Sequence, residues 1–194
     1  MATGGMDLAR ALKADGRRVF LDWKLHDIGE TVRRAAAAIT AAGADLLTVH
    51  AEPQVMAAAV KGRDGDAQTK ILGVTVLTSL TEGDLAAMGY GLGVRDLVEK
   101  RIRQALDCGI DGVVASPQEA ALARKIASEA GRADFLVVTP GVRPSWAAKN
   151  DQARAATPAD ALRDGASHLV VGRPITAALD PREAALKIVA EMMG

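Results

Sequence analysis

Short apolar runs alternate along the chain with longer alanine-rich stretches of helical period, and glycine, aspartate or proline marks each change. The apolar runs predict six strands, at residues 18–22, 46–50, 71–76, 112–115, 136–139 and 169–171. The periodic stretches predict helices at residues 6–14, 31–42, 53–61, 94–108, 117–130, 158–163 and 181–193. This alternation is typical of an α/β fold with a parallel sheet.

Polar side chains follow nearly every predicted strand, at its carboxyl end. Examples are Asp22, His50, Thr78, Ser116 and Arg173. An open doubly wound sheet concentrates such residues at one switch point, whereas a closed barrel collects them around its mouth. The spread along the whole chain therefore favours a TIM (β/α)8-type barrel.

The number of predicted strand-helix units is smaller than the eight of a complete barrel. A barrel of ~250 residues uses ~31 residues per unit, so that six units need ~190. The chain has 194 residues, and a helix at residues 6–14 precedes its first predicted strand. We therefore expect residues 1–194 to form a single partial barrel domain of about six units, with the first two units missing.

Composition narrows the choice of partners and compartment. Lys and Arg total 24, as do Asp and Glu, so the formal net charge of zero gives no reason to expect nucleic acid or a membrane surface as a partner. Cys108 is the single cysteine, which fits a reducing cytosol. No apolar run approaches the ~18 residues that span a bilayer. The three scattered histidines predict no metal site. We expect a cytoplasmic protein.

The run FLDWKLHDI at residues 20–28 carries the strongest chemical signal. Asp22 and Lys24 are two residues apart on a predicted strand, so their side chains point to the same side. A surface ion pair, with Asp27 capping the next helix, explains this spacing as well as a catalytic pair does. Residues elsewhere in the chain must decide between these two interpretations.

The same run resembles the DxKxxDI signature of orotidine 5′-phosphate decarboxylases of the bacterial type, and three later segments resemble that family in the same order. They are VTVLTS at residues 74–79, VTPGVRP at 138–144 and VGRPIT at 171–176. DxKxxD alone is shared with related phosphosugar enzymes, but its combination with the last two segments is highly specific. The resemblance extends from about residue 4 to the C-terminus.

The resemblance implies a homodimeric barrel that needs no metal or organic cofactor and converts orotidine 5′-monophosphate to uridine 5′-monophosphate in pyrimidine biosynthesis. It implies that Lys24 donates a proton to C6, that Asp22 is its charged neighbour, and that Asp27 serves the other subunit's site. A carbanion at C6 has no ring carbonyl positioned to delocalise it, so a fixed ammonium is well suited to stabilise and protonate it.

Phosphate recognition is the second predicted function of the chain. Gly172 lets backbone approach a phosphate closely, and Arg173 offers a planar charged fork. The resemblance adds Arg143 and Gln152 to the phosphate contacts. Taken alone, Gly172 and Arg173 fit a plain turn into a helix, but two such segments after consecutive strands favour a phosphate site.

Thr78 and Ser116 are candidates for contacts to the pyrimidine and the ribose, because a hydroxyl both donates and accepts hydrogen bonds. Ser116 fits a helix N-cap equally well, since Glu119 follows at the capping-box spacing. His50 at a strand end is more typical of a packing residue than of a base.

Two other functions remain open at this stage. A Mg²⁺-dependent phosphosugar lyase or aldolase would place acidic metal ligands at strand ends, where Glu52 is a weak candidate. A catalytically impaired, truncated remnant would bind phosphate or a partner subunit without turning over substrate. Release of CO₂ distinguishes the decarboxylase from both.

Overall fold

The computed structural model describes residues 4–65, 68–147 and 156–193, and all six predicted strands are present within them. They are β1 (Phe20–Leu25), β2 (Leu46–His50), β3 (Lys70–Val74), β4 (Gly112–Val114), β5 (Leu136–Thr139) and β6 (His168–Leu169). Hydrogen bonds connect neighbouring strands in chain order, and β1 with β2, β2 with β3 and β5 with β6 pair in parallel. Successive strand-helix units predict this arrangement.

Every predicted helix is also present, with each end within two residues of its expected place. These helices are α1 (Gly5–Ala14), α2 (Gly29–Ala41), α3 (Pro53–Arg63), α5 (Val94–Asp107), α6 (Pro117–Glu129), α7 (Pro158–Arg163) and α9 (Pro181–Met192). Two short helices, α4 (Glu82–Ala87) and α8 (Arg173–Thr176), were not predicted. No helix in the described part of the chain is long and apolar enough to cross a membrane.

Four predicted strands, β1, β3, β4 and β6, have different bounds in the structure, and β3 and β4 end at Val74 and Val114 rather than at residues 76 and 115. β1 begins later than predicted and continues beyond Asp22, because Leu25 still pairs with Val49 of β2. β6 covers His168–Leu169 rather than residues 169–171, although Val170 N still donates to Thr139 O at 2.9 Å. β6 ends within the apolar run LVV at residues 169–171, and β1 continues through Asp22 and Lys24, so hydrophobicity alone does not mark the strand ends.

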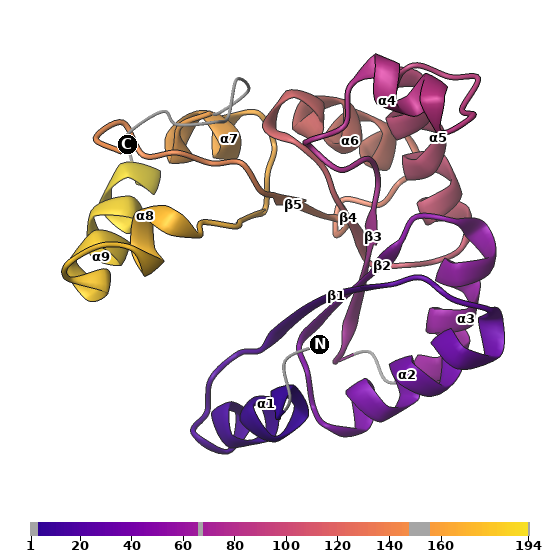
Figure 1. Cartoon of the computed structure of the whole chain (residues 1–194), viewed down its shortest axis with the longest axis horizontal. Helices are drawn as coiled ribbons and strands as arrows, with labels where there is room; N and C mark the ends of the chain where they lie inside the picture. Colours follow the sequence, from indigo (N-terminus) through magenta and orange to yellow (C-terminus); the bar gives the residue numbers. More distant parts are fainter. Residues whose placement is uncertain (1–3, 66–67, 148–155, 194) are drawn as a thin grey trace. The chain divides into compact units, whose positions relative to one another are not determined.

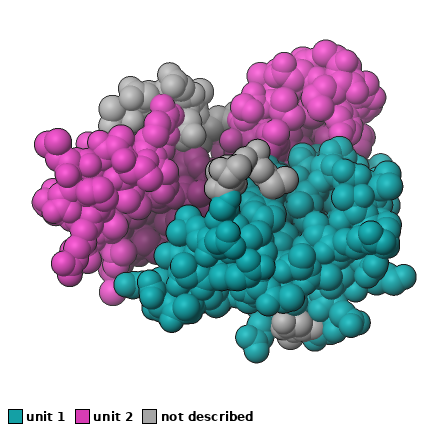
Figure 2. Space-filling view, turned by 60° about the horizontal axis from the view of Figure 1, so that its bottom comes forward, with its two compact units in different colours: residues 1–75, 100–113 teal, residues 76–99, 114–194 magenta. Residues whose placement is uncertain are grey.

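The chain divides into two compact units, Met1–Thr75 with Lys100–Val113 and Val76–Glu99 with Val114–Gly194, coloured separately in Figure 2. Hereafter these are unit 1 and unit 2. The prediction of a single partial domain is not tested by this division and stays a prediction.

The core of unit 1 is formed by its central strands and the helices beside them. Leu47 and Val49 on one face of β2 are completely buried, as are Ile71 and Leu72 on the two faces of β3, which is typical of parallel strands covered by helices. α2 and α3 pack against each other (Figure 1). Their close approach requires Gly62, where an added Cβ would lie 2.2 Å from a backbone oxygen of α2. The residues at the strand ends of unit 1 therefore rest on a closely packed core.

Unit 2 has a smaller cluster near the ends of β5 and β6. Val142, Ala161 and Ala166 are buried together, and Leu169 and Val171 pack against them. This cluster gives the segments that follow β5 and β6 a shared apolar base. The residues predicted to bind phosphate lie next to it in the sequence.

Candidate active site

Asp22 and Lys24 of β1 lie side by side, as their spacing predicts. Lys24 Nζ donates a hydrogen bond to Asp22 Oδ2 over 2.7 Å. The two side chains are 37% and 47% exposed, so solvent or a ligand can reach both. The roles of these residues in catalysis stay predictions, but a carboxylate and an ammonium do converge at the end of this strand.

The backbone at Lys24 departs from a regular strand. Its φ is 47°, in the left-handed region that residues other than glycine seldom adopt. The register changes at the same place: Leu21 pairs with Leu47, but Leu25 pairs with Val49, so β1 uses two more residues than β2 over this stretch. Irregularities of this kind re-aim side chains beside active sites.

Thr48 of β2 connects the two parts of this irregular segment. Its side chain is completely buried, and its Oγ1 accepts a hydrogen bond from Lys24 N at 2.9 Å. The same hydroxyl donates to Asp22 Oδ1 at 2.9 Å. Sequence reasoning did not identify Thr48 as a functional residue. The available signal was a polar residue at the centre of the apolar run LLTVH.

Asp27 lies just beyond β1 and is exposed. Its Oδ1 accepts a hydrogen bond from Ile28 N at 2.7 Å. The alternative that Asp27 caps the next helix is wrong, because Ile28 occupies the N-cap position of α2 and no side-chain hydrogen bond caps that helix. The contribution of Asp27 to another subunit stays a prediction.

Two histidines and a glutamate lie close to this segment in unit 1. His26 Nε2 is 3.0 Å from Glu52 Oε2, and the rings of His26 and His50 are 4.7 Å apart. Burial, and secondly the nearby His26, hold the pKa of His50 below its usual value. Within residues 4–65, 68–147 and 156–193, no three His, Cys, Asp or Glu side chains are grouped so as to hold a metal ion.

The predicted phosphate-binding residues follow β5 and β6 in unit 2. Arg143 is partly buried; its Nη1 donates to Val142 O at 3.3 Å, and its backbone N donates to Ala156 O at 2.9 Å. Arg173 begins α8, with exposed Gly172 as its N-cap residue. Val142 and Val171 share one apolar cluster, so the two segments start from a common base. Gln152 lies outside the described residues.

The two hydroxyl candidates have different surroundings. Thr78 is exposed in the loop after β3. Ser116 is 4% exposed, and both its backbone N and its Oγ donate to Glu119 Oε2 at the start of α6. The capping role predicted for Ser116 is therefore present, and contacts of either residue with a substrate stay predictions.

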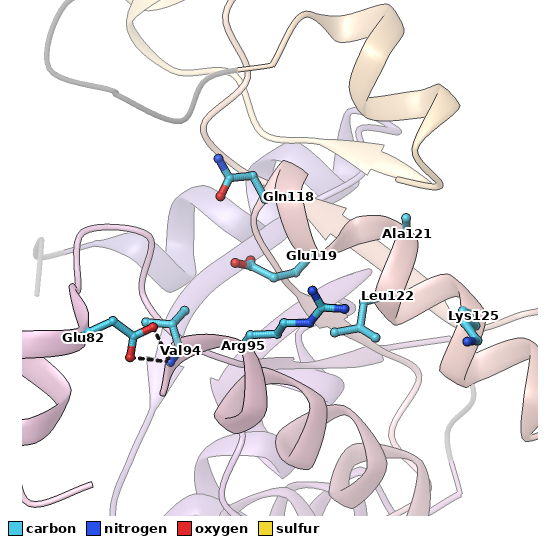
Figure 3. A pocket seen from close by; sticks show the side chains of 8 residues that line it. All are labelled: Glu82, Val94, Arg95, Gln118, Glu119, Ala121, Leu122 and Lys125. Carbon is cyan, nitrogen blue, oxygen red and sulfur yellow. Dashed lines mark hydrogen bonds between the residues drawn. The ribbon is translucent and has the colours of Figure 1, made fainter. Parts of the chain in front are cut away.

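A cavity of about 590 Å³ in unit 2 does not contain any of the predicted site residues. Figure 3 shows the residues that line it, which come from the start of α4, the start of α5 and one face of α6. Both carboxylate oxygens of Glu82 accept from Val94 N at 3.0 Å, so this acid serves to cap α5. The cavity is thus distinct from the residues that follow β5 and β6.

Known proteins resemble the chain over nearly all of its length. Residues 1–188 match the family described as Orotidine 5'-phosphate decarboxylase / HUMPS. The orotidine 5'-phosphate decarboxylase of Caulobacter vibrioides (strain NA1000 / CB15N) is 70% identical over 194 residues, which are 100% of this chain and 83% of that protein. The protein of the same name from Rhodopseudomonas palustris (strain BisA53) is 56% identical, over 98% of this chain and 79% of that protein.

Solved structures agree with these sequence relatives. The crystal structure of orotidine 5'-phosphate decarboxylase from Lactobacillus acidophilus matches with a TM-score of 0.83 at 35% identity, over 98% of this chain and 82% of that chain. The enzyme of that name from Pyrococcus horikoshii OT3 matches with a TM-score of 0.71 at 28% identity, over 98% of this chain. The predicted TIM-barrel type of fold is thereby confirmed. The chain belongs to the orotidine 5'-phosphate decarboxylase / HUMPS family.

Proposed function

We propose that the chain decarboxylates orotidine 5′-monophosphate to uridine 5′-monophosphate, with Lys24 as the proton donor to C6. The observation that supports this most strongly is the Asp22–Lys24 pair, with its 2.7 Å hydrogen bond, inside the DxKxxDI signature. Relatives that are 70% and 56% identical carry the name of this activity. Family membership and the geometry of the pair therefore support the same reaction.

The reaction needs one group that is positive before the proton moves and neutral afterwards. When the C6–carboxylate bond breaks, CO₂ leaves and the electron pair stays on C6. The Lys24 ammonium stabilises that charge electrostatically and then transfers a proton to C6, so the amine becomes neutral and regains a proton from water. Asp22 holds the ammonium in place before transfer, and a fixed donor needs little reorganisation during the reaction.

Recognition of the substrate phosphate is proposed for Arg143, Gly172 and Arg173. A guanidinium binds phosphate oxygens through charge-assisted and often paired hydrogen bonds. Support comes from the shared apolar base of the two segments that carry these residues. Gln152, Thr78 and Ser116 complete the proposed set of substrate contacts.

A homodimer is proposed as the active form, with Asp27 reaching the site of the second subunit. Support comes from its exposure and from the absence of a capping role. A carboxylate at the end of a strand that is not used by its own helix is available to another chain.

The direct test is release of CO₂ from carboxyl-labelled orotidine 5′-monophosphate by the purified chain, with orotidine as the control substrate. We expect release that depends on the 5′-phosphate and a product identified as uridine 5′-monophosphate. Binding of uridine 5′-monophosphate without any CO₂ release would contradict the proposal and favour a remnant that only binds nucleotide. Release of CO₂ with equal efficiency from orotidine would contradict the phosphate assignment alone.

A further inference from the structure

We propose that Thr48 is a positioning residue that holds Asp22 and Lys24 in their reactive arrangement through a single buried hydroxyl. The effect on turnover rests on the proposed function, whereas the effect on the local structure does not. Three hydrogen bonds form a closed ring: Lys24 N to Thr48 Oγ1 at 2.9 Å, Thr48 Oγ1 to Asp22 Oδ1 at 2.9 Å, and Lys24 Nζ to Asp22 Oδ2 at 2.7 Å.

The chemistry of the three groups fixes the direction of every bond in this ring. A backbone N–H only donates and an ionised carboxylate only accepts, whereas a hydroxyl has one proton and free lone pairs. The Thr48 hydroxyl must therefore accept from Lys24 and give its proton to Asp22. Threonine is also restricted at χ1, so its Oγ1 keeps its place without further support.

Burial makes the hydroxyl hard to replace by solvent. Thr48 has no exposed surface, and neither do Leu47 and Val49, whose side chains point to the other face of β2. A water molecule would need space and several polar partners to take the place of this hydroxyl. Without the hydroxyl, one oxygen of Asp22 and the N–H of Lys24 would each lose a partner at a part-buried position.

The same hydroxyl also explains how Lys24 keeps a left-handed backbone. The register between β1 and β2 is broken between Leu21 and Leu25, so the N–H of Lys24 finds its acceptor in a side chain of β2. A non-glycine residue with φ of 47° persists only where its surroundings determine its conformation. The hydrogen bond from Lys24 N to Thr48 holds this conformation, and the bond from Thr48 to Asp22 orients the carboxylate at the same time.

Thr48→Val tests the proposal, because it removes the hydroxyl while keeping the branched shape. With orotidine 5′-monophosphate as substrate, we expect kcat to fall about tenfold to a hundredfold, as small misplacements of reacting groups do. KM should change by less than about threefold, since no phosphate contact is altered. Thr48→Ser keeps the hydroxyl and should retain kcat within about threefold of the parent chain.

A matched control is available in the same unit. Thr69 is 1% exposed, and its Oγ1 donates to Ala44 O at 2.8 Å, so Thr69→Val also removes a buried hydroxyl and one hydrogen bond. We expect Thr69→Val to lower the melting temperature about as much as Thr48→Val while leaving kcat unchanged. An equal loss of kcat in both valine variants would overturn the positioning role.

A second measurement does not depend on catalysis. Hydrogen exchange of the Lys24 backbone N–H should be protected in the parent chain and in Thr48→Ser, and unprotected in Thr48→Val. If the parent chain releases no CO₂, the proposed function fails, but this exchange measurement still decides for or against Thr48. If Thr48→Val does not fold, Thr48→Ala takes its place. Unchanged exchange at Lys24 together with unchanged kcat would refute the inference.

Discussion

The two sets of predicted site residues are held in very different ways. In unit 1, Asp22 and Lys24 are linked to each other and to buried Thr48 by hydrogen bonds of 2.7 to 2.9 Å. In unit 2, Arg143 contacts Val142 O at 3.3 Å, and Arg173 begins a helix of only four residues. A group that takes part in bond breaking must be in place beforehand, whereas a group that binds phosphate can complete its hydrogen bonds when the ligand arrives.

The largest effect is expected when Lys24 is removed from the hydrogen-bonded residues of unit 1. Lys24→Ala removes the proposed proton donor, so turnover of orotidine 5′-monophosphate should fall by at least about a thousandfold, within the range for loss of a positioned acid and its charge. Binding of uridine 5′-monophosphate, measured by calorimetry, should remain within about tenfold of the parent chain, because no phosphate contact is lost. Lys61→Ala, an exposed lysine on α3, is the control and should change neither quantity. Turnover within tenfold of the parent would exclude Lys24 as the donor.

The next effect tests the contact with the substrate phosphate that is proposed for Arg173 in unit 2. Arg173→Ala should lower kcat/KM for orotidine 5′-monophosphate by roughly tenfold to a hundredfold, because a charge-assisted hydrogen bond contributes about 1.5 to 3 kcal/mol. The loss should nearly vanish with orotidine, which lacks the phosphate. Arg182→Ala on α9 is also an exposed arginine of unit 2 and serves as the control. An equal loss with both substrates would show that Arg173 acts on structure rather than on phosphate.

The sequence predicted the fold better than it predicted the local geometry of the site. β2 and β5 have the bounds that the runs LLTVH and LVVT predict. α4 was missed although Thr81 and Asp84 form a capping box that marks its start, whereas α7, which is equally short but begins with Pro158, was predicted. Short helices carry too few periodic positions to stand out from loops.

The geometry of the candidate site could be predicted from the sequence only in part. The spacing of Asp22 and Lys24 predicted that their side chains converge, since alternate residues of a strand share a face. It did not predict the left-handed backbone of Lys24 or the role of Thr48. Both depend on the register between β1 and β2, which joins residues about 24 positions apart in the chain and is set by tertiary packing rather than by a local pattern.

A smaller effect, on the free energy of unfolding, tests the contribution of Asp45, which lies just before β2 in unit 1. Asp45 accepts hydrogen bonds from Val19 N at 2.6 Å and from Lys13 Nζ at 2.9 Å, and thus ties α1 to the segment that enters β1. Burial alone would raise the pKa of Asp45, but the Val19 N–H and the Lys13 ammonium outweigh it, and the pKa is held below its usual value. Asp45→Asn should lower the free energy of unfolding by about 1 to 3 kcal/mol at pH 7.

The pH dependence of this difference follows from the direction of the pKa shift. A carboxyl group with a lowered pKa in the folded state stabilises the fold above its unfolded pKa of ~3.9, and this contribution is lost as the pH falls through the folded value. Urea unfolding should therefore show the gap between the parent chain and Asp45→Asn narrowing from pH 7 to pH 3. Asp7→Asn, at a highly exposed position on α1, is the control. A gap that stays constant down to pH 3 would contradict the charged role of Asp45.

The smallest effect concerns His50, which lies at the end of β2, two residues beyond Thr48. Burial, and secondly the nearby His26, lower its pKa, so the folded state favours the neutral ring. The unfolded chain binds a proton at His50 below pH ~6.5, and the free energy of unfolding should therefore decrease as the pH falls from ~6.5 toward the folded pKa. Below that pKa both states are protonated, and the decrease should stop.

His50→Gln should remove this slope, because glutamine does not titrate, whereas His26→Gln should only reduce it. Burial is the larger cause of the lowered pKa of His50, and it remains when the charge at His26 is removed. Glu52, which raises the pKa of His50, remains as well. Urea unfolding between pH 5 and pH 8 gives the slope, and titration of the ring proton resonances gives the pKa of His50 directly. A His50 pKa above its ordinary value, or a slope that is unchanged in His50→Gln, would show that this end of β2 does not exclude solvent as its burial indicates. It would also weaken the contrast between the hydrogen-bonded site residues of unit 1 and the residues of unit 2 that are proposed to bind phosphate.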